Sequence, residues 1–201
     1  MKIHNDLEQG TEEWFKARNG KMTASNAHTI SVAGKGLDTY IAKIVSDMFA
    51  AHKEEGYKSK EMERGSELES QAKAIYELEH SLEIENVGFI EYSSYVGCSP
   101  DGLIGESGGI EIKCINNASY FKLLIGEEEP DSGYVWQCMM CLMITNRAWW
   151  DLVFYNPNFK KSTIVFRILP DAAKINKLKI GLAIGEEKIN ALISKFEKHN
   201  I

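Results

Sequence analysis

The sequence predicts an α/β fold in which a central β-sheet is flanked by helices. Apolar residues at helical spacing fill the N-terminal third, short β-rich runs occupy the middle, and a long amphipathic stretch closes the chain. With 201 residues, the chain is long enough for one domain with a sizeable core, since single domains commonly have about 100–200 residues. It shows no internal repeat, low-complexity segment or linker, so we expect one domain over residues 1–201.

The first helix is indicated by its capping residues. Thr11 supplies a capping hydroxyl, and Glu12 and Glu13 place acids in the positive first turn. Gly20 is a residue type that ends helices, so this helix is expected to stop near residue 19. A second helix start is expected at residues 23–25.

Two longer helices are expected next, separated by an exposed loop. Apolar residues recur at helical spacing over residues 37–52, and residues 61–79 are again helical. The charged stretch at 52–63, HKEEGYKSKEME, is expected to be the loop between them.

The sheet is expected to form from four β-rich segments. Residues 82–98 contain VGFIEYSSYVGC, a pattern typical of a hairpin that turns near Ser93. The alternating GGIEIKC at 108–114 predicts a strand, and AWWDLVFY at 148–155 and STIVFRIL at 162–169 predict two more.

The remaining helices differ in their apolar surfaces. A short helix and a loop are expected over 121–133, where Pro130 closes the loop. Residues 132–145, SGYVWQCMMCLMIT, are apolar nearly all round, so this helix is expected to be buried. The tail from Asp171 predicts a long amphipathic helix.

The composition, 44% hydrophobic and 26% charged, is typical of a soluble globular protein. Its apolar runs are shorter than the roughly 20 residues of a membrane span, and the N-terminus lacks the apolar core of a secretory signal. We therefore expect a cytoplasmic protein with no membrane partner. The net charge of -6 argues against a nucleic acid partner, because phosphates are bound by Lys and Arg. That objection weakens if the acids form a metal site.

The stretch at 97–114, GCSPDGLIGESGGIEIKC, combines acids and a lysine in a pattern that suits a metal site. Successive strand side chains point to opposite faces, so Glu111 and Lys113 share one face while Ile110 and Ile112 share the other. If the glycine-rich loop folds back as a hairpin, Asp101 reaches the same place. Two carboxylates suit Mg²⁺, and a nearby lysine can orient a water or offset developing charge. This chemistry is typical of metal-assisted phosphodiester hydrolysis.

A simpler interpretation of the same stretch stays open at this level. A Glu and a Lys two residues apart on a half-exposed strand are common solvated neighbours, and Asp before Gly is ordinary turn chemistry. Short motifs of this kind arise often by chance. The order of the whole pattern favours the functional interpretation: a turn Asp101, about ten residues, then Glu111-Ile112-Lys113 on a strand.

That order resembles the PD-(D/E)XK nuclease superfamily, with Pro100-Asp101 followed by Glu111-Ile112-Lys113. Further blocks resemble the phage lambda-type exonucleases, also called the YqaJ-like viral recombinase family. In chain order they read GTEEWFKARNGKMTASN, ERGSELESQA, GCSPDGLIG with GGIEIKC, YVWQ and AWWDLVFYNP. The similarity is collinear over about residues 9 to 168. It implies a restriction-endonuclease-like (PD-(D/E)XK) core with a central mixed β-sheet flanked by helices.

The resemblance also implies an activity. Enzymes of this family are Mg²⁺-dependent exonucleases that enter duplex DNA ends and digest one strand from 5′ to 3′, leaving 3′ overhangs for recombination by single-strand annealing. It implies Mg²⁺, or Mn²⁺ as a substitute, in two copies per site, held by Asp101, Glu111 and the backbone carbonyl of Ile112. It further implies a homotrimeric ring, a phage single-strand annealing protein as partner, and a phage or prophage origin in a bacterial cytoplasm.

A third acid is proposed at Glu69. On a helix, Gly65, Glu69, Ala72 and Tyr76 form one stripe, and the small residues would let a neighbouring backbone approach the carboxylate. A solvated glutamate is the alternative. The resemblance implies that Glu69 belongs to the metal site.

Arg18 and Ser25 form a candidate anion pocket. Arg18 follows Trp14 by four residues, so the guanidinium can lie along the indole, and Ser25 is placed at a helix start, where free N–H groups favour an anion. An ordinary cap and a surface arginine are the alternative. The resemblance implies that both recognise the 5′-phosphate of the DNA end.

Gln137 is a hydrogen-bonding amide in an otherwise apolar helix. A buried amide needs partners, so Gln137 is either a satisfied core residue or a partner of the lysine, the water or a phosphate oxygen. The resemblance implies the second role. Cys138 and Cys141 have the C-x-x-C spacing found in iron–sulfur nucleases, but no cysteine follows them, so we expect core packing.

Three functions remain to be distinguished. The first is the duplex-end exonuclease, and the second is a structure-specific or restriction-type endonuclease on the same fold. The third is a DNA-end binder without activity, which the presence of Asp101, Glu111 and Lys113 argues against. Residues 51–62 and 126–133 are candidates, by position, for splitting the duplex.

Overall fold

The computed structural model describes residues 1–50 and 60–199, with side-chain environments for 1–50 and 67–199. The helices are α1 (Glu12–Arg18), α2 (Ala27–Val32), α3 (Lys35–Phe49), α4 (Lys60–His80), α5 (Asn117–Leu124), α6 (Ser132–Thr145) and α7 (Ala172–His199). The strands are β1 (Lys2–His4), β2 (Met22–Thr23), β3 (Ile84–Glu85), β4 (Phe89–Ser93), β5 (Val96–Cys98), β6 (Gly102–Ile104), β7 (Gly108–Cys114), β8 (Trp149–Tyr155) and β9 (Thr163–Ile168).

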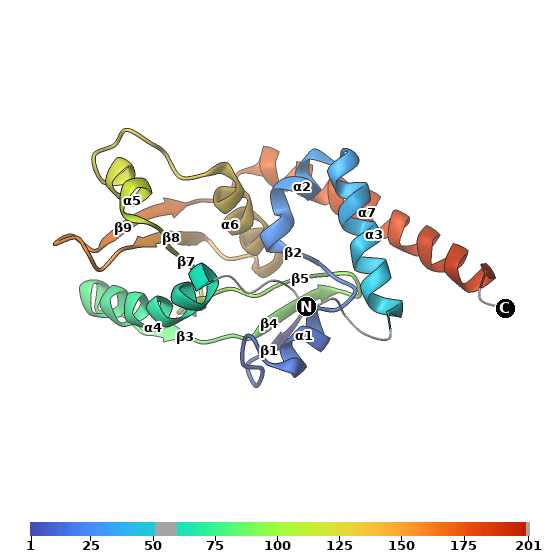
Figure 1. Cartoon of the computed structure of the whole chain (residues 1–201), viewed down its shortest axis with the longest axis horizontal. Coiled ribbons are helices and arrows are strands. Elements are labelled where there is room, and N and C mark those ends of the chain that lie inside the picture. Colours follow the sequence, from blue (N-terminus) through green and yellow to red (C-terminus); the bar gives the residue numbers. More distant parts are fainter. Residues whose placement is uncertain (51–59, 200–201) are drawn as a thin grey trace.

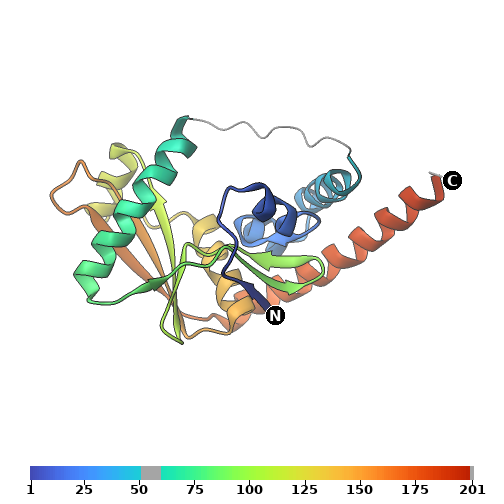
Figure 2. The ribbon, with the colours of Figure 1, turned by 90° about the horizontal axis from the view of Figure 1, so that it is seen from below.

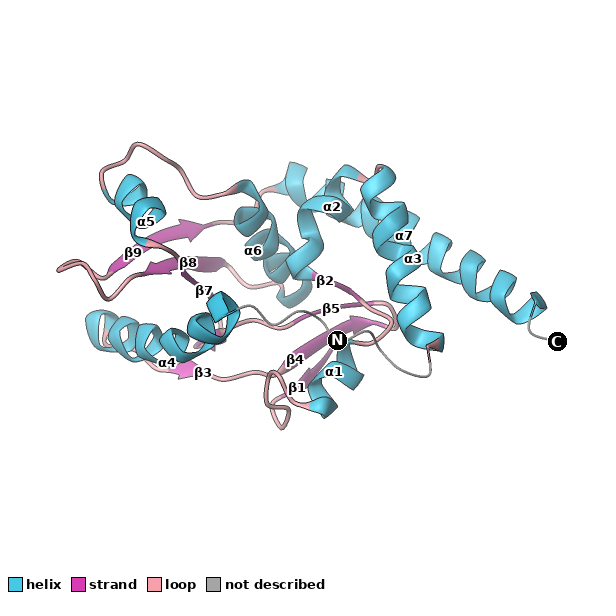
Figure 3. Ribbon diagram, in the orientation of Figure 1, coloured by secondary structure: helices cyan, strands magenta, loops and turns pink. Residues whose placement is uncertain are grey.

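The strands form two sheets rather than the one sheet expected from the sequence (Figure 3). The larger sheet is mixed, with the order β3-β6-β7-β8-β9, in which β7 and β8 are parallel and the other pairs antiparallel. The smaller sheet has the order β1-β4-β5-β2 and contains the predicted hairpin of VGFIEYSSYVGC, which forms β4 and β5. Its outer strands, β1 and β2, have three and two residues, which is too short for an alternating pattern to be recognised.

Helices cover both faces of the larger sheet (Figures 1 and 2). Helix α4 runs along one face, where Ala72 and Tyr76 pack against Ile110 and Ile112 of β7. Helix α6 lies on the other face, and its buried residues join a core shared with α2, α3 and α7. The last turns of α7 extend beyond both sheets toward the C-terminal end.

The alternation predicted for residues 108–114 is confirmed. Ile110 and Ile112 are buried on the α4 side, whereas Glu111 and Lys113 are hydrogen-bonded to Gln137 of α6 on the other side. The predicted burial of α6 is also confirmed, since residues 138–142 are all buried. Strand β7 therefore presents its two polar side chains to α6.

Two boundaries differ from the sequence-based prediction. The helix start expected at residues 23–25 is present as a 3₁₀ turn, Ala24–Asn26, with Thr23 at its N-cap position, but the α-helix itself begins only at Ala27, and Met22–Thr23 pairs with β5. The Thr23 N–H donates to the Tyr40 hydroxyl at 3.0 Å, a tertiary contact that outweighs local preference. The loop expected to extend to residue 63 ends earlier, because α4 begins at Lys60. Lys, Glu and Met favour helix there, and residues 51–59 lie outside the described residues.

Within residues 1–50 and 60–199, no helix is both long and apolar enough to cross a membrane.

Candidate active site

The hairpin of β6 and β7 brings the turn acid to the strand pair. Gly102 pairs with Ile110 across this antiparallel hairpin, so the preceding Asp101 lies beside β7. The Oδ2 atom of Asp101 accepts a hydrogen bond from the backbone N–H of Ile112 at 2.6 Å. The expected meeting of Asp101 with the Glu111–Lys113 strand is therefore present.

Glu111, Lys113 and Gln137 form a closed hydrogen-bonded triangle. Glu111 is only 2% exposed, and its Oε1 accepts from Lys113 Nζ at 2.7 Å and from Gln137 Nε2 at 2.6 Å. The Lys113 ammonium also donates to Gln137 Oε1 at 3.3 Å and lies 4.9 Å from the ring centre of Tyr134. Each of the three polar side chains thus orients the other two, and Gln137 acts as a partner of both charged groups.

Burial and neighbouring charges shift the pKa values of the two acids and the lysine of this site. Burial raises the pKa of Asp101 well above its ordinary value, and the neighbouring carboxylates of Glu111 and Glu69 raise it further. Burial also raises the pKa of Glu111, against the opposing effect of Lys113. For Lys113, burial alone would lower the pKa, but the carboxylates of Glu111 and Asp101 outweigh it and raise the pKa. The lysine is therefore held as a cation beside two acids that ionise with difficulty.

The donor set fits a divalent metal ion. The Oε2 atom of Glu111 is buried and has no hydrogen-bond partner among the described residues, which leaves an oxygen lone pair for a ligand. Together with the carboxylate of Asp101 it provides hard oxygen donors of the kind Mg²⁺ prefers. The backbone carbonyl of Ile112 stays a predicted ligand.

Glu69 lies near these acids but has a different partner. Its Oε1 forms an ion pair with Lys73 Nζ at 3.0 Å on the same helix, and its side chain is 35% exposed. Among the described residues, no three acids, histidines or cysteines are arranged as a ready-made metal site. Glu69, Lys73 and Asp101 do line one cavity of about 610 Å³, together with Trp14. Glu69 therefore shares a cavity with Asp101, while its carboxylate is paired with Lys73.

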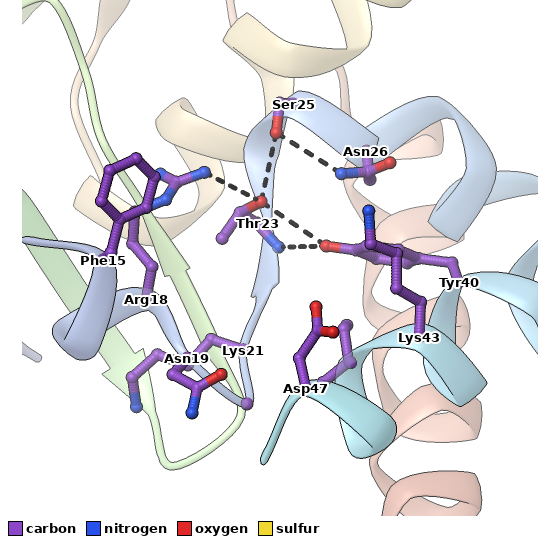
Figure 4. Close-up of a pocket in the computed structure, with 12 residues that line it drawn as sticks. Phe15, Arg18, Asn19, Lys21, Thr23, Ser25, Asn26, Tyr40, Lys43 and Asp47 are labelled. Carbon is purple, nitrogen blue, oxygen red and sulfur yellow. Dashed lines mark hydrogen bonds between the residues drawn. The ribbon is translucent and has the colours of Figure 1, made fainter. Parts of the chain in front are cut away.

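The predicted pairing of Arg18 with Trp14 is confirmed. The guanidinium carbon of Arg18 lies 4.3 Å from the Trp14 ring centre. Arg18 donates from Nη1 to Ser99 Oγ at 2.7 Å and from Nη2 to Thr23 Oγ1 at 3.5 Å. Thr23 Oγ1 in turn lies 3.1 Å from Ser25 Oγ. Arg18 and Ser25 are thus joined through Thr23 in one polar cluster (Figure 4).

This cluster lines a cavity of about 320 Å³ that Lys43 and Tyr40 of α3 border from the opposite side (Figure 4). Burial lowers the pKa of Arg18, although Tyr40 and Cys98 act in the opposite direction. No carboxylate among the described residues forms an ion pair with Arg18; its contacts are hydroxyls and an aromatic ring. A partly buried cation without an acidic partner suits an anion that enters the cavity.

Several residues of the site were missed from the sequence. Ser99 links Arg18 to the Pro100-Asp101 turn, Lys73 pairs with Glu69, and Tyr134 lies under Lys113. Ser99 offered a signal, because it is a polar residue directly before the turn motif. Lys73 offered another, because it follows Glu69 by four residues on a helix. Nothing in the local sequence distinguished Tyr134.

The fold and the site together define the class of protein. A mixed sheet flanked by helices, with an acid turn and a Glu-x-Lys strand on one hairpin, is the PD-(D/E)XK nuclease core. The YqaJ-like viral recombinase domain matches residues 13–148. The chain belongs to this family.

Solved structures support this assignment over nearly the whole chain. An alkaline exonuclease from Laribacter hongkongensis, LHK-Exo, is 32% identical, with a TM-score of 0.80 over 94% of this chain and 99% of that chain. Its complex with dAMP matches equally well. A phage-related exonuclease from Haemophilus somnus 129PT, 16% identical, has a TM-score of 0.71 over 90% of this chain and 98% of that chain, and shows the shared fold. Comparison with curated proteins gave no match.

Proposed function

We propose that the protein is a Mg²⁺-dependent exonuclease that digests duplex DNA ends from 5′ to 3′ and leaves 3′ overhangs. The family assignment and the likeness to an alkaline exonuclease support DNA hydrolysis. One observation carries the preference for a 5′ end. Arg18 lines the anion cavity and donates to Ser99, only two residues before Asp101, so this cavity is linked to the turn that holds Asp101. A terminal phosphate held by Arg18 and Ser25 would leave the adjoining phosphodiester beside the acids.

Asp101 and Glu111 are the proposed metal ligands, with Glu69 and the Ile112 carbonyl as further ligands and two ions per site. The buried, unpartnered Oε2 of Glu111 supports this assignment. When bound, Mg²⁺, or Mn²⁺ in its place, supplies the positive charge that activates water and stabilises the attacking and leaving oxygens. Hydrolysis then needs no covalent enzyme intermediate.

Lys113 acts through its positive charge in this proposal. Because Glu111 and Asp101 raise its pKa, the ammonium stays protonated and donates hydrogen bonds rather than accepting a proton. It is held between Glu111 and Gln137, where it can orient the attacking water and offset charge that develops on the phosphate. Gln137 fixes the direction of both charged side chains.

The proposed biological setting rests on the family resemblance. We propose a homotrimeric ring around the DNA, and a phage single-strand annealing protein that receives the 3′ overhang. The corresponding location is the cytoplasm of a bacterial host that carries the phage or prophage. Because the net charge is -6, such a ring would have to concentrate its basic residues on its inner surface.

The alternative is an endonuclease on the same fold, and DNA topology separates the two. The experiment compares a linear duplex that carries 5′-phosphates with the same DNA as a covalently closed circle, in the presence of Mg²⁺. An enzyme that needs an end degrades the linear DNA and leaves the circle intact. Cutting of the circle at a comparable rate would overturn the exonuclease proposal in favour of the endonuclease.

A further inference from the structure

A charged group lies in the core on the α4 side of the sheet, away from Lys113. Asp151 of β8 is only 1% exposed. Its two oxygens accept from Arg167 Nε and Nη2, both at 2.8 Å, and Oδ2 also accepts from the Tyr76 hydroxyl at 2.5 Å. Arg167 is the residue opposite Asp151 on β9, and its guanidinium stacks on Trp149 at 4.0 Å. We call Tyr76, Asp151 and Arg167 the Asp151 clamp.

The clamp connects α4 with the strand beside the catalytic strand. In the parallel pair of β7 and β8, Asp151 lies opposite Ile110, the residue before Glu111. Tyr76 belongs to α4 and follows Glu69 by seven residues, which is about two helical turns or 10 Å along the axis. Both residues therefore lie on the same stripe of α4. A contact that fixes the position of Tyr76 against β8 therefore also fixes the position of Glu69 relative to Asp101 and Glu111.

Apolar packing alone would leave this register loosely determined. Ala72 and Tyr76 are fully buried against Ile110 and Ile112, but apolar contacts have no preferred direction. A hydrogen bond to a buried, doubly held carboxylate has a defined direction and length. Burial and Asp151 both raise the pKa of Tyr76, so its hydroxyl stays a donor.

The other end of the stripe reaches the acid site. Glu69 and Asp101 line the same cavity, and Glu69 Oε1 forms an ion pair with Lys73 Nζ at 3.0 Å on its own helix. A shift of α4 along the sheet would therefore move Glu69 relative to Asp101.

We infer that Tyr76 is a positioning residue, whose bond to the Asp151 clamp holds α4 in the register at which Glu69 meets the metal bound by Asp101 and Glu111. This inference rests on the proposed function, because it assumes a metal at that site. Tyr76 acts through Glu69 and touches neither metal nor DNA. Its removal should therefore weaken metal binding, and only while Glu69 is present.

The test measures the dissociation constant of Mn²⁺ alone by calorimetry. Tyr76→Phe removes the hydroxyl and leaves Asp151 paired with Arg167, so the fold should be retained. Tyr120→Phe is the matched control, because Tyr120 is also 0% exposed and its hydroxyl donates at 2.7 Å to the Lys161 carbonyl, which does not belong to α4. Tyr76→Phe is expected to weaken Mn²⁺ binding about tenfold, as loss of a supporting partner does, and Tyr120→Phe by less than about twofold.

The second half of the test asks whether Tyr76 acts through Glu69. In a Glu69→Gln background, Tyr76→Phe is expected to add less than about twofold to the dissociation constant. An equal loss in both Tyr→Phe variants, no loss in Tyr76→Phe, or a full loss in the Glu69→Gln background would each overturn the inference. Mn²⁺ binding by the wild type must also be abolished by Asp101→Asn. If the wild type binds no Mn²⁺, or if Asp101→Asn binds it equally well, the metal site of the proposed function is wrong and the inference is overturned with it.

A measurement on the unmodified protein gives an independent check. Coupling between sites is reciprocal, so Mn²⁺ should in turn stabilise the contact of Tyr76 with Asp151. Amide hydrogen exchange along α4 is expected to slow around Tyr76 as well as around Glu69 when Mn²⁺ is added. Slowing confined to the residues around Glu69 would contradict the inference.

Discussion

Asp101 is hydrogen-bonded to the backbone N–H of Ile112 at 2.6 Å, across the β6–β7 hairpin. Ile112 is the residue between Glu111 and Lys113, so the turn acid is attached at the centre of the strand motif. The side chain of Ile112 is buried against the α4 side of the sheet. The hairpin therefore holds Asp101, Glu111 and Lys113 as one unit anchored in the core.

Asp101→Asn is expected to stabilise the metal-free protein while abolishing activity. Asparagine keeps an oxygen that can accept from Ile112, but it removes a buried carboxylate whose ionisation is opposed by burial, Glu111 and Glu69. Relief of such functional strain commonly adds about 0.5–2 kcal/mol to the free energy of unfolding. Urea unfolding in the presence of a chelator measures it, and a destabilised Asp101→Asn protein would contradict the expectation.

The same comparison has a defined pH dependence. The folded-state pKa of Asp101 lies above its ordinary value of 3.8, so the folded state retains a proton that the unfolded chain releases. The stabilising contribution of Asp101 is thus fully present below its ordinary pKa of 3.8 and is lost as the pH rises through the higher folded-state pKa. The advantage of Asp101→Asn over wild type should grow as the pH rises from the ordinary pKa of 3.8 through the raised folded-state pKa of Asp101. An advantage independent of pH would contradict this cause.

Gln137→Met is expected to reduce the rate of hydrolysis about 10- to 100-fold, the usual cost of losing a partner that orients charged ligands. Methionine has a similar length but makes neither the 2.6 Å bond to Glu111 nor the 3.3 Å bond from Lys113. Single-turnover digestion of a linear duplex measures the rate, and thermal unfolding checks the fold. A rate equal to wild type would show that Gln137 is only a satisfied core amide.

Arg18→Met is expected to remove the preference for 5′-phosphorylated over 5′-hydroxyl ends. A charge-assisted hydrogen bond contributes about 1.5–3 kcal/mol, so the wild-type preference should be at least about tenfold. Arg147→Met is the matched control, because Arg147 binds the backbone carbonyls of Gly105 and Gly108 in the turn of the β6–β7 hairpin and does not line the anion cavity. Competition between the two DNA ends measures the preference. If Arg18→Met retains it, the pocket is assigned wrongly.

Local patterns were sufficient to predict the catalytic strand. The faces of Ile110, Glu111, Ile112 and Lys113 follow from strand alternation, and the hairpin to Asp101 follows from the glycine-rich loop. The stacking of Arg18 on Trp14 likewise follows from helical spacing, and the structure confirms it. These contacts lie within one element or one turn, where the sequence separation determines the geometry.

Contacts between distant segments could not be predicted in the same way. Tyr76 and Asp151 are separated by 75 residues, and Arg18 and Ser99 by 81, so no local period indicates that they meet. The smaller sheet escaped prediction because β1 and β2 contain too few residues for a pattern. The position of Glu69 relative to Asp101 depends on how α4 packs, which one helix's sequence does not specify.

The most direct test of the account follows which strand is degraded and whether Lys113 is required. A linear duplex with 5′-phosphates carries one label at a 5′ end and another at a 3′ end, and is digested with Mg²⁺. The account predicts early release of the 5′ label as a nucleotide monophosphate, and a loss of at least about 100-fold in Lys113→Met. Lys174→Met, which breaks a surface ion pair with Asp171, is the control. Early release of the 3′ label, or wild-type activity in a folded Lys113→Met protein, would contradict the account.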